Sequence, residues 1–290
     1  MSVLKIENLS YTYNEGMPGA TKALDNVNLE IEEGTFVGVI GHTGCGKSTL
    51  ISHLNGLTKP QHGAIYLDGK DIWKDYKDIR QVRFTVGLVF QYPEYQLFEE
   101  TVYKDIAFGP KNMGLSNEEI DKRVKMAAEF CGITKQMLAA SPFDLSGGQK
   151  RRVAIAGIIA MQPRVLVLDE PCAGLDPEGR EQILSQVKNY HFTTGGTVIL
   201  VSHSMEDIAN YADKVLVMDG GKVYKYAPTE EIFQDAENLS KMGLGIPDIT
   251  KVFLKLKEMG LDINTDVYTV PYAIKTLLKY KAKNGGANNA

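Results

Sequence analysis

The feature that most constrains the fold is a glycine-rich loop between an apolar run and a helical segment. The loop Gly41-His-Thr-Gly-Cys-Gly-Lys-Ser48 fits the pattern G-x-x-x-x-G-K-[ST] and follows the run Phe36–Ile40. In this context backbone N–H groups wrap a nucleotide phosphate at the helix N-terminus, Lys47 reaches the β- and γ-phosphates, and Ser48 ligates Mg²⁺. A ligand-free turn is the alternative, and the agreement of strand, loop and helix argues against it. The predicted ATP-binding residues are Gly41, His42, Thr43, Gly44, Cys45, Gly46, Lys47, Ser48 and Thr49.

Short β-branched runs alternate with helical patterns along most of the chain, which predicts an α/β fold with a mostly parallel sheet covered by helices. One further strand is predicted to be half exposed, because Val27, Leu29 and Ile31 alternate with polar residues. Buried strands are predicted at Phe36–Ile40, Val86–Phe90, Val165–Leu168, Thr197–Val201 and Val215–Met218.

Helices are predicted between these strands. Ser116-Asn-Glu-Glu119 has the form of a capping box that opens a helix through about Phe130. Pro177 is a plausible first position of a second helix that runs to about Tyr190. The segment from about Tyr92 to Leu145 has little strand signal and is predicted to be a helical insertion.

The character of the chain changes after about residue 229. One amphipathic helix is predicted there from the apolar spacing of Ile249, Val252, Phe253 and Leu256. Pro271 is predicted to open a second helix with apolar residues Ile274, Leu277 and Leu278. The tail, residues 284–290, is predicted to be disordered.

Composition excludes some functional classes. The formal net charge is −4 and the pI is about 5.8, which argues against a nucleic-acid-binding protein. The longest apolar run, near Ala154–Met161, is shorter than the ~18 residues of a spanning helix, and no N-terminal apolar leader is visible. The three cysteines match no metal-binding spacing, so we expect a soluble chain in a reducing cytosol.

Two carboxylates end the apolar run Val165-Leu-Val-Leu-Asp169-Glu170. Ligands of open α/β sheets bind at the carboxyl ends of the strands, where this pair is predicted to lie. Asp169 is expected to hold Mg²⁺ through water, and Glu170 to act as general base toward the attacking water. A solvated acidic turn would be the commoner explanation for such a pair without the phosphate loop.

A second glycine-rich segment precedes a helix predicted to start near Gln149. It consists of Leu145, Ser146, Gly147, Gly148 and Gln149, and a helix N-terminus of this kind binds anions. Since the first loop already supplies a complete cradle, we expect this segment to contact the ATP of another subunit, with two chains head to tail. The alternative is a helix capped by Ser146 with two incidental glycines.

The segments GHTGCGKST, LVFQ, LSGGQ, VLVLDEP, AGLD and LVSH occur in this order, and the chain resembles the ATPase subunit of ABC transporters over roughly residues 3–228. The resemblance implies a P-loop NTPase core with an antiparallel β subdomain in an ATPase domain spanning 1–228. It also implies a helical subdomain at about 92–160 and a helical appendix at 229–283. In such a fold the second loop is the signature of the family.

The same resemblance implies roles for four further residues. Tyr13 would stack on adenine, although an isolated tyrosine is more often a surface or core residue. Gln91 would contact Mg²⁺ and water and sense a transmembrane partner. Asp176 would lie at the dimer interface. His203 would touch the γ-phosphate and orient Glu170, although a lone histidine after a strand is more often structural.

Three segments resemble the A-component ATPases of energy-coupling factor (ECF) transporters, most closely the second of two paired A-components. They are Val89–Val102, the GHTG form of the phosphate loop, and the appendix MGLGIPDITKVFLKLKEMGLDI. The resemblance implies uptake of vitamins or transition-metal ions by a heterodimer of A-components, a transmembrane T-component and a substrate-binding membrane S-component. The chain would be peripheral at the cytoplasmic face, without nucleic acid. The appendix would add contacts between A-components, or alternatively fold back on its own domain.

Three further hypotheses concern a surface groove, the Cys45 thiol and a basic helix face. A groove for a basic amphipathic helix is predicted from the aromatic and acidic residues Phe90, Tyr92, Glu94, Tyr95, Phe98, Glu99 and Glu100. The Cys45 thiol is expected to have a lowered pKa beside Lys47, unless it is buried and inert. The basic segment Gln149–Arg152 is expected to be a solvated helix face.

Two other classes of ABC ATPase remain as alternatives. An ATPase of an ordinary transporter with two permeases would carry a different appendix or none. A non-transport ATPase of DNA repair or translation would carry a long coiled coil or a second cassette, and the single cassette with a short stretch at 92–144 argues against it.

Overall fold

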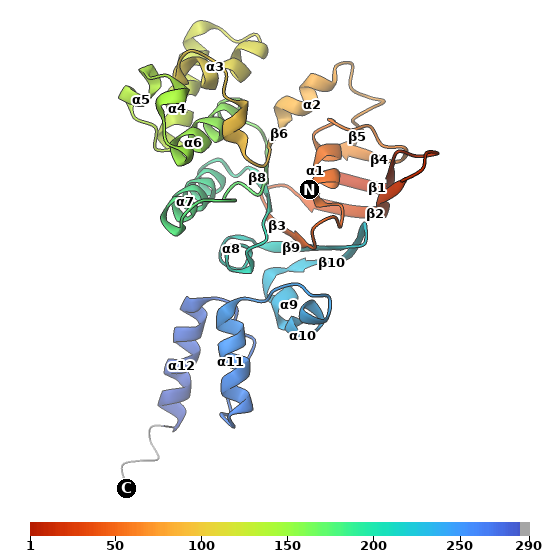
Figure 1. The fold of residues 1–290 in the computed structure, drawn as a ribbon, viewed down its shortest axis with the longest axis vertical. Coiled ribbons are helices and arrows are strands. Elements are labelled where there is room, and N and C mark those ends of the chain that lie inside the picture. Colours follow the sequence, from red (N-terminus) through yellow and green to blue (C-terminus); the bar gives the residue numbers. More distant parts are fainter. Residues whose placement is uncertain (285–290) are drawn as a thin grey trace.

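The structure is a computed structural model that describes residues 1–284 (Figure 1). Its larger sheet has the strand order β10-β9-β3-β8-β7-β6, in which β10 is antiparallel to β9 and the other pairings are parallel. The five parallel strands are almost continuously apolar and buried because both faces of the sheet are covered, one by helices and the other largely by a second, antiparallel sheet. The predicted parallel sheet is confirmed. Its strands are β3 (Phe36–Gly41), β6 (Val86–Val89), β7 (Val165–Asp169), β8 (Thr197–Val201), β9 (Lys214–Asp219) and β10 (Lys222–Pro228).

A second, antiparallel sheet lies beside the first, with the order β2-β1-β4-β5 (Figure 1). Val27, Leu29 and Ile31 are buried and alternate with more exposed residues, as predicted for a half-exposed strand. Their buried face packs in one apolar cluster with α1 (Lys47–Leu54) and with residues of the larger sheet. The strands are β1 (Ser2–Tyr13), β2 (Thr21–Glu32), β4 (His62–Leu67) and β5 (Lys70–Asp71).

The helical insertion predicted after the LVFQ segment is present. Its helices stand together at one end of the molecule, above α7 in Figure 1. They are η1 (Pro93–Gln96), α3 (Val102–Asn112), α4 (Asn117–Phe130), α5 (Lys135–Ala139), η2 (Pro142–Asp144) and α6 (Gly147–Ile159). The remaining helices outside the insertion and the C-terminal appendix are α2 (Ile79–Thr85), α7 (Pro177–Thr194), α8 (Met205–Tyr211), α9 (Thr229–Gln234) and α10 (Ala236–Lys241).

The start of α4 differs in one respect from the predicted capping box. Ser116 Oγ accepts a hydrogen bond from Glu119 N at 3.3 Å, as expected. The Glu119 side chain, however, accepts from Arg123 Nε at 2.7 Å, one turn further along the helix. The charged i, i+4 pair therefore takes the carboxylate that the box would have used. A complete capping box occurs instead at the start of α6.

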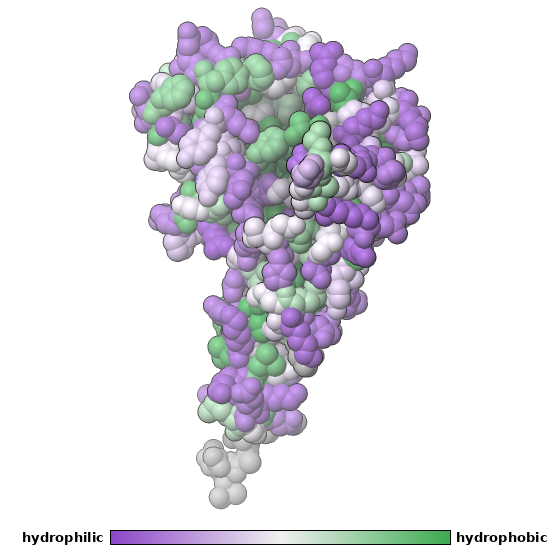
Figure 2. Space-filling view, turned by 45° about the vertical axis from the view of Figure 1, so that its right-hand side comes forward, coloured by the Kyte–Doolittle hydropathy of each residue, from purple (hydrophilic) through white to green (hydrophobic). Residues whose placement is uncertain are grey.

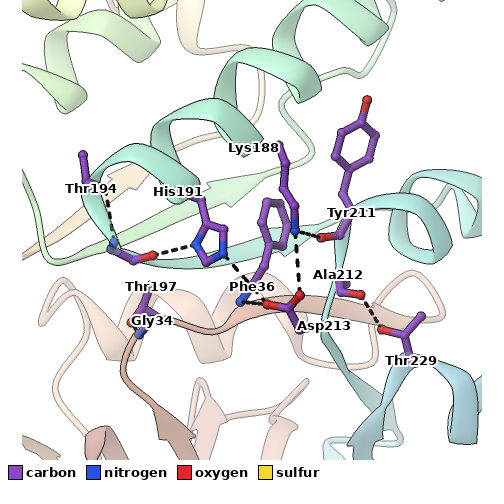
Figure 3. A network of polar contacts seen from close by, with 11 residues as sticks. Gly34, Phe36, Lys188, His191, Thr194, Thr197, Tyr211, Ala212, Asp213 and Thr229 are labelled. Carbon is purple, nitrogen blue, oxygen red and sulfur yellow. Dashed lines mark hydrogen bonds and ion pairs between the residues drawn. The ribbon is translucent and has the colours of Figure 1, made fainter.

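A polar network fixes the ends of the strands that lie opposite the phosphate loop (Figure 3). Asp213, just before β9, accepts from Phe36 N at the start of β3 at 2.8 Å. Lys188 on α7 donates to Tyr211 O at 2.9 Å and lies 3.7 Å from the Asp213 carboxylate. His191 Nε2 is 3.9 Å from the same carboxylate. The network ties α7 to the beginning of β3, the strand that delivers the phosphate loop.

The appendix consists of α11 (Asp248–Glu258) and α12 (Val270–Asn284), which project as a pair from the sheets (Figure 1). A small cluster around Phe253, Ile263, Val267 and Ala273 holds the pair together. The predicted apolar faces are only partly used by this packing. Four of their residues are at least 42% exposed: Val252, Ile274, Leu277 and Leu278. Figure 2 shows hydrophobic surface on the narrow lower part of the molecule.

Two remaining expectations concern the membrane and the tail. Within residues 1–284, no helix combines the length and the apolar character needed to cross a membrane. The tail predicted to be disordered lies outside the described residues, except for Asn284, which ends α12.

Candidate functional site

The phosphate loop joins β3 to α1 in a conformation that requires glycine. Gly46, the N-cap of α1, has φ +102°. A Cβ atom there would lie 2.4 Å from Ala23 O of the antiparallel sheet, well inside contact distance. The absence of a side chain thus lets the loop close against β2. The positive φ of Gly46 is the local part of this requirement, and the sequence pattern predicts it; the contact with Ala23 is not visible in the pattern.

Lys47 is 6% exposed and its ammonium group points into the loop. Nζ donates to Gly41 O at 2.6 Å and to His42 O at 2.8 Å. The charge is therefore held at the concave side of the loop, among backbone groups. The His42 side chain turns the other way, and its Nε2 contacts Met242 O at the end of α10. His42 thus contributes its backbone to the loop, whereas its ring connects the loop to the segment before the appendix.

A pocket of about 530 Å³ opens over the loop and α1. Most of the residues predicted for ATP binding and catalysis line it, and they come from five separated parts of the chain. Its lining also includes Thr21 and Ala23 of β2, which the sequence analysis missed because no motif marks them. The lining residues are Tyr13, Thr21, Ala23, Thr43, Gly44, Gly46, Lys47, Ser48, Thr49, Gln91, Glu170 and His203.

Tyr13 lies at the rim of this pocket. Its hydroxyl is 3.1 Å from Thr49 Oγ1, and its ring is 45% exposed. Tyr11 meets it edge to face, with the ring centroids 5.0 Å apart, and fixes the orientation of the ring. An exposed aromatic face held in this way is suited to stack on a planar base.

Glu170 is held by two side chains that the sequence analysis assigned to the same site. His203 Nε2 lies 2.6 Å from Glu170 Oε1, and Gln91 Nε2 donates to Glu170 Oε2 at 3.1 Å. The backbone of Glu170 is left-handed, with φ +48°, a conformation that is costly for a residue with a side chain. The turn aims the carboxylate into the pocket instead of along the strand.

Asp169 lies just before Glu170 and is 7% exposed. Burial raises the pKa of its carboxyl, and a hydrogen bond with Ser48 acts in the opposite direction. This contact brings a hydroxyl and a carboxylate together at the foot of the phosphate loop. Such oxygen donors suit a hard divalent cation, with phosphate oxygens and water completing its coordination. Among the residues described here, no cluster of three or more His, Cys, Asp or Glu side chains forms a metal site by itself.

The second glycine-rich segment forms a separate pocket of about 620 Å³. Its helix, α6, begins at Gly147, two residues earlier than predicted, with a capping box between Ser146 and Gln149. Asp176 lines the same pocket and accepts from Gly179 N at 2.8 Å, which caps α7. This pocket and the pocket over the phosphate loop share no lining residue. The chain therefore carries two physically distinct pockets, one over the phosphate loop and one at the signature segment.

The prediction for Cys45 is wrong in sign. Cys45 is 6% exposed, and burial raises the pKa of its thiol even though Lys47 Nζ lies 3.8 Å from Sγ. The loop packs the sulfur against Gly41, where a Cβ atom would come within 2.5 Å of it. Desolvation of a thiolate outweighs one neighbouring cation here. The alternative of a buried, unreactive thiol fits the structure.

The residues predicted to form a helix-binding groove lie only in part as expected. Tyr95 and Phe98 are exposed as expected. Glu94 faces inward, however, and pairs with Arg151, which is 3% exposed and not part of a solvated face. An apolar groove of about 380 Å³ lies beside these residues, between η1, α3 and α6. Phe84 and Phe108 line it and were missed, because their sequence neighbourhoods carry no groove signal.

Comparison with known proteins agrees with this geometry. The sequence model of the family described as "ABC transporter" matches residues 24–173, which include the phosphate loop, the signature segment and the paired carboxylates. The fold and the site thus define an ATPase of the ABC transporter class.

Two relatives show to which kind of ABC transporter ATPase the chain belongs. The "Energy-coupling factor transporter ATP-binding protein EcfA2" of Caldanaerobacter subterraneus subsp. tengcongensis is 54% identical, over 96% of this chain and 97% of that protein. The protein of the same name from Clostridium acetobutylicum is 53% identical, over 95% of this chain and 97% of its own length. The chain therefore belongs to the energy-coupling factor transporter ATP-binding proteins, as its sequence resemblance implied.

Solved structures support the fold. The structure of cbiO1 from Clostridium perfringens, described as part of the ABC transporter complex cbiONQ, has a TM-score of 0.73 and 40% identity, covering 86% of this chain and 97% of that chain. The bacterial ABC transporter cassette MJ0796, solved as a dimer, has a TM-score of 0.69 and 30% identity, covering 78% of this chain and 98% of that chain.

Proposed function

We propose that this chain hydrolyses ATP as an A-component of an ECF-type importer of vitamins or transition-metal ions. It would work at the cytoplasmic face of the membrane with a second, different A-component, a transmembrane T-component and a substrate-binding S-component. The observation that carries the proposal is the convergence of Gln91, Glu170 and His203 on one pocket over the phosphate loop. The names of the relatives support the ECF type.

In the proposed reaction, Glu170 accepts the proton of the attacking water, and His203 and Gln91 hold its carboxylate in place. Lys47 and the backbone N–H groups of the loop stabilise the negative charge of the phosphates. Ser48 and Asp169 are the residues that would hold Mg²⁺, which offsets phosphate charge when bound. Gln91 would reach the same ion after leaving Glu170.

The proposal includes a head-to-tail pair of ATPases, which the two separate pockets support. The signature pocket has no phosphate loop of its own, and its exposed helix N-terminus at Ser146–Gln149 suits the phosphates of an ATP bound to the facing subunit. The cassette MJ0796, solved as a dimer bound to ADP and Pi, supports the pairing of this chain with a second ATPase. ATP would then close the pair, and hydrolysis would open it.

The apolar groove beside η1 is the proposed contact for the T-component. Phe84, Phe98 and Phe108 provide an apolar lining, and Glu99 and Glu100 lie at the neighbouring surface. An amphipathic helix with basic flanks fits this combination.

The appendix is the proposed contact with the other A-component. The exposed apolar residues of α11 and α12 suit packing against that subunit.

The test is affinity purification of the tagged full-length chain from gently solubilised membranes, followed by mass spectrometry. Recovery of a second, different ABC ATPase with one T-type and one or more S-type membrane proteins is the expected result. Recovery of two conventional permeases with this ATPase alone would instead favour an ordinary ABC transporter. Ribosomal or DNA-repair proteins in place of membrane proteins would contradict a transport function.

A further inference from the structure

A buried arginine on the signature helix contacts two other segments of the chain. Arg151 Nε donates to Glu94 Oε2 at 2.9 Å, and Nη2 contacts Glu94 Oε1, so the ion pair is bidentate. Nη1 donates to Ala173 O at 2.6 Å and to Pro171 O at 3.2 Å. The guanidinium carbon lies 5.7 Å from the centroid of the Tyr92 ring.

These partners lie next to the residues of the proposed reaction. Glu94 is on η1, three residues after Gln91, and Tyr92 with φ +54° forms the bend between them. Pro171 directly follows Glu170, and the chain continues from Ala173 to Asp176 in the signature pocket. Arg151 itself lies on α6, whose first turn forms the other wall of that pocket. One side chain therefore joins both half-sites of the same subunit.

We propose that Arg151 is a positioning residue that keeps the segments after Gln91 and Glu170 in register with the signature helix. It lines the signature pocket but no part of the pocket over the phosphate loop. Its guanidinium donors are taken up by Glu94 and by the carbonyl oxygens of Pro171 and Ala173, so it acts through the residues that it holds. The inference deepens the proposed function, since it rests on the roles assigned there to Gln91 and Glu170. It predicts that turnover depends on Arg151 while nucleotide affinity does not.

Only arginine meets all of these contacts at once. Its planar fork of donors serves a carboxylate on one side and two carbonyl oxygens on the other. Lysine keeps the positive charge but has one compact ammonium group, so Arg151→Lys retains attraction to Glu94 and loses the bonds to Pro171 and Ala173. A buried carbonyl left without a donor favours opening of the segment to water.

The chain contains a reporter for this opening. Cys172 lies between the two carbonyls that Arg151 binds, and it is half-buried, with burial raising the pKa of its thiol to about 12. Cys131, the C-cap residue of α4, is buried, and burial raises the pKa of its thiol to about 12 as well. Local opening at residues 171–173 exposes only Cys172, whereas global unfolding exposes both thiols.

The first test is the alkylation rate of each cysteine in the full-length, nucleotide-free chain, with a small maleimide and mass spectrometry. Arg151→Lys should raise the Cys172 rate by about tenfold while the Cys131 rate changes by less than about twofold. Arg123→Lys is the matched control, because Arg123 also combines an ion pair, with Glu119, and a carbonyl contact, to Met161 O. It should leave the Cys172 rate unchanged. Equal acceleration of both thiols by Arg151→Lys, or no acceleration, overturns the proposal.

The second test is steady-state ATP hydrolysis in the assembly that turns over. Arg151→Lys should lower kcat by about tenfold, because reacting groups held slightly out of place lose rate steeply, and should change KM by less than about twofold. An unchanged kcat, or a rise in KM with kcat intact, overturns the proposal. The alkylation result does not depend on ATPase activity, so a failure of the proposed function and a failure of this inference are distinguishable.

Discussion

His203 Nε2 lies 2.6 Å from Glu170 Oε1 across the gap between the ends of β8 and β7. Gln91, from the end of β6, donates to the other oxygen of the same carboxylate. The carboxyl ends of three neighbouring parallel strands thus place a histidine, a glutamate and a glutamine around one point. This geometry makes Glu170 the group whose removal should be most damaging to turnover.

Glu170→Gln should retain ATP binding and lower kcat by about 10²–10⁴-fold, the usual contribution of a general base. The amide has nearly the shape of the carboxylate but cannot accept the proton, so ATP should persist and hold the ATPase pair closed. Size-exclusion chromatography with ATP and steady-state hydrolysis measure the two effects. Glu118→Gln, at an exposed position without an assigned role, is the control and should hydrolyse normally. Normal turnover by Glu170→Gln would remove the proposed base.

Asp169→Asn should stabilise the nucleotide-free protein at pH 7 while abolishing ATP turnover with Mg²⁺. Burial raises the pKa of the Asp169 carboxyl above its ordinary value of 3.8. The protonated carboxyl therefore stabilises the folded state below pH 3.8, and this contribution is lost as the pH rises through the folded-state pKa. At pH 7 the ionised carboxylate therefore opposes folding, and asparagine removes this effect. Thermal melts at pH 7 and pH 4 should show a gain in Tm that shrinks at the lower pH.

The control for that prediction is a carboxylate whose pKa is shifted in the opposite direction. Lys22 lowers the pKa of Asp25, a surface carboxylate, so Asp25→Asn should give no gain in Tm at pH 7. A Tm for Asp169→Asn at or below the wild-type value would contradict the prediction for Asp169.

Gly46→Ala should prevent ATP binding and destabilise the fold by about 1–3 kcal/mol, the cost of a strained backbone. The new methyl group would meet Ala23 O at 2.4 Å, so the loop must move away from β2. Gly44→Ala is the matched comparison, because Gly44 also has positive φ but a Cβ there meets no atom within 4 Å. Denaturant melts should rank Gly46→Ala as clearly less stable than Gly44→Ala. Equal stability of the two variants would argue against close packing of the loop on β2.

Ile274→Glu should leave the thermal stability of the isolated chain almost unchanged, because Ile274 is 55% exposed. It should weaken association with the second A-component by about tenfold or more if α12 packs in that interface. Lys275→Gln changes the charge by the same amount at the next position and should associate normally. Sedimentation velocity of the mixed A-components measures the difference. Association of Ile274→Glu at wild-type strength would remove α12 from the proposed interface.

The parts predicted correctly from the sequence are those that local rules determine. The phosphate loop needs glycine within a few residues of Lys47, and the buried strands need continuous apolar runs. Glu170 was placed from the end of its strand, because parallel strands bring their carboxyl ends to one edge. Gln91 and His203 were placed by the resemblance to ABC transporter ATPases, and both lie beside Glu170.

The errors concern contacts between distant segments. Glu94 was expected at a partner surface, but Arg151, 57 positions further along, pairs with it inside the protein. Cys45 was expected to be acidic because Lys47 is near in sequence, and burial by other elements reverses the sign. Local charge patterns do not reveal how much water a folded chain removes from a group, so neither result followed from the sequence.

The separation of the two pockets has a genetic consequence. A chain with a defective phosphate loop still carries an intact signature segment, and the reverse also holds, since no lining residue belongs to both pockets. In a pair of different ATPases, lesions in the phosphate loop of one chain and the signature of the other fall on the same composite site and spare the second. Placed together on one chain, the same two lesions damage both sites. Alleles of the two genes should therefore complement or fail to complement according to which half-site each affects.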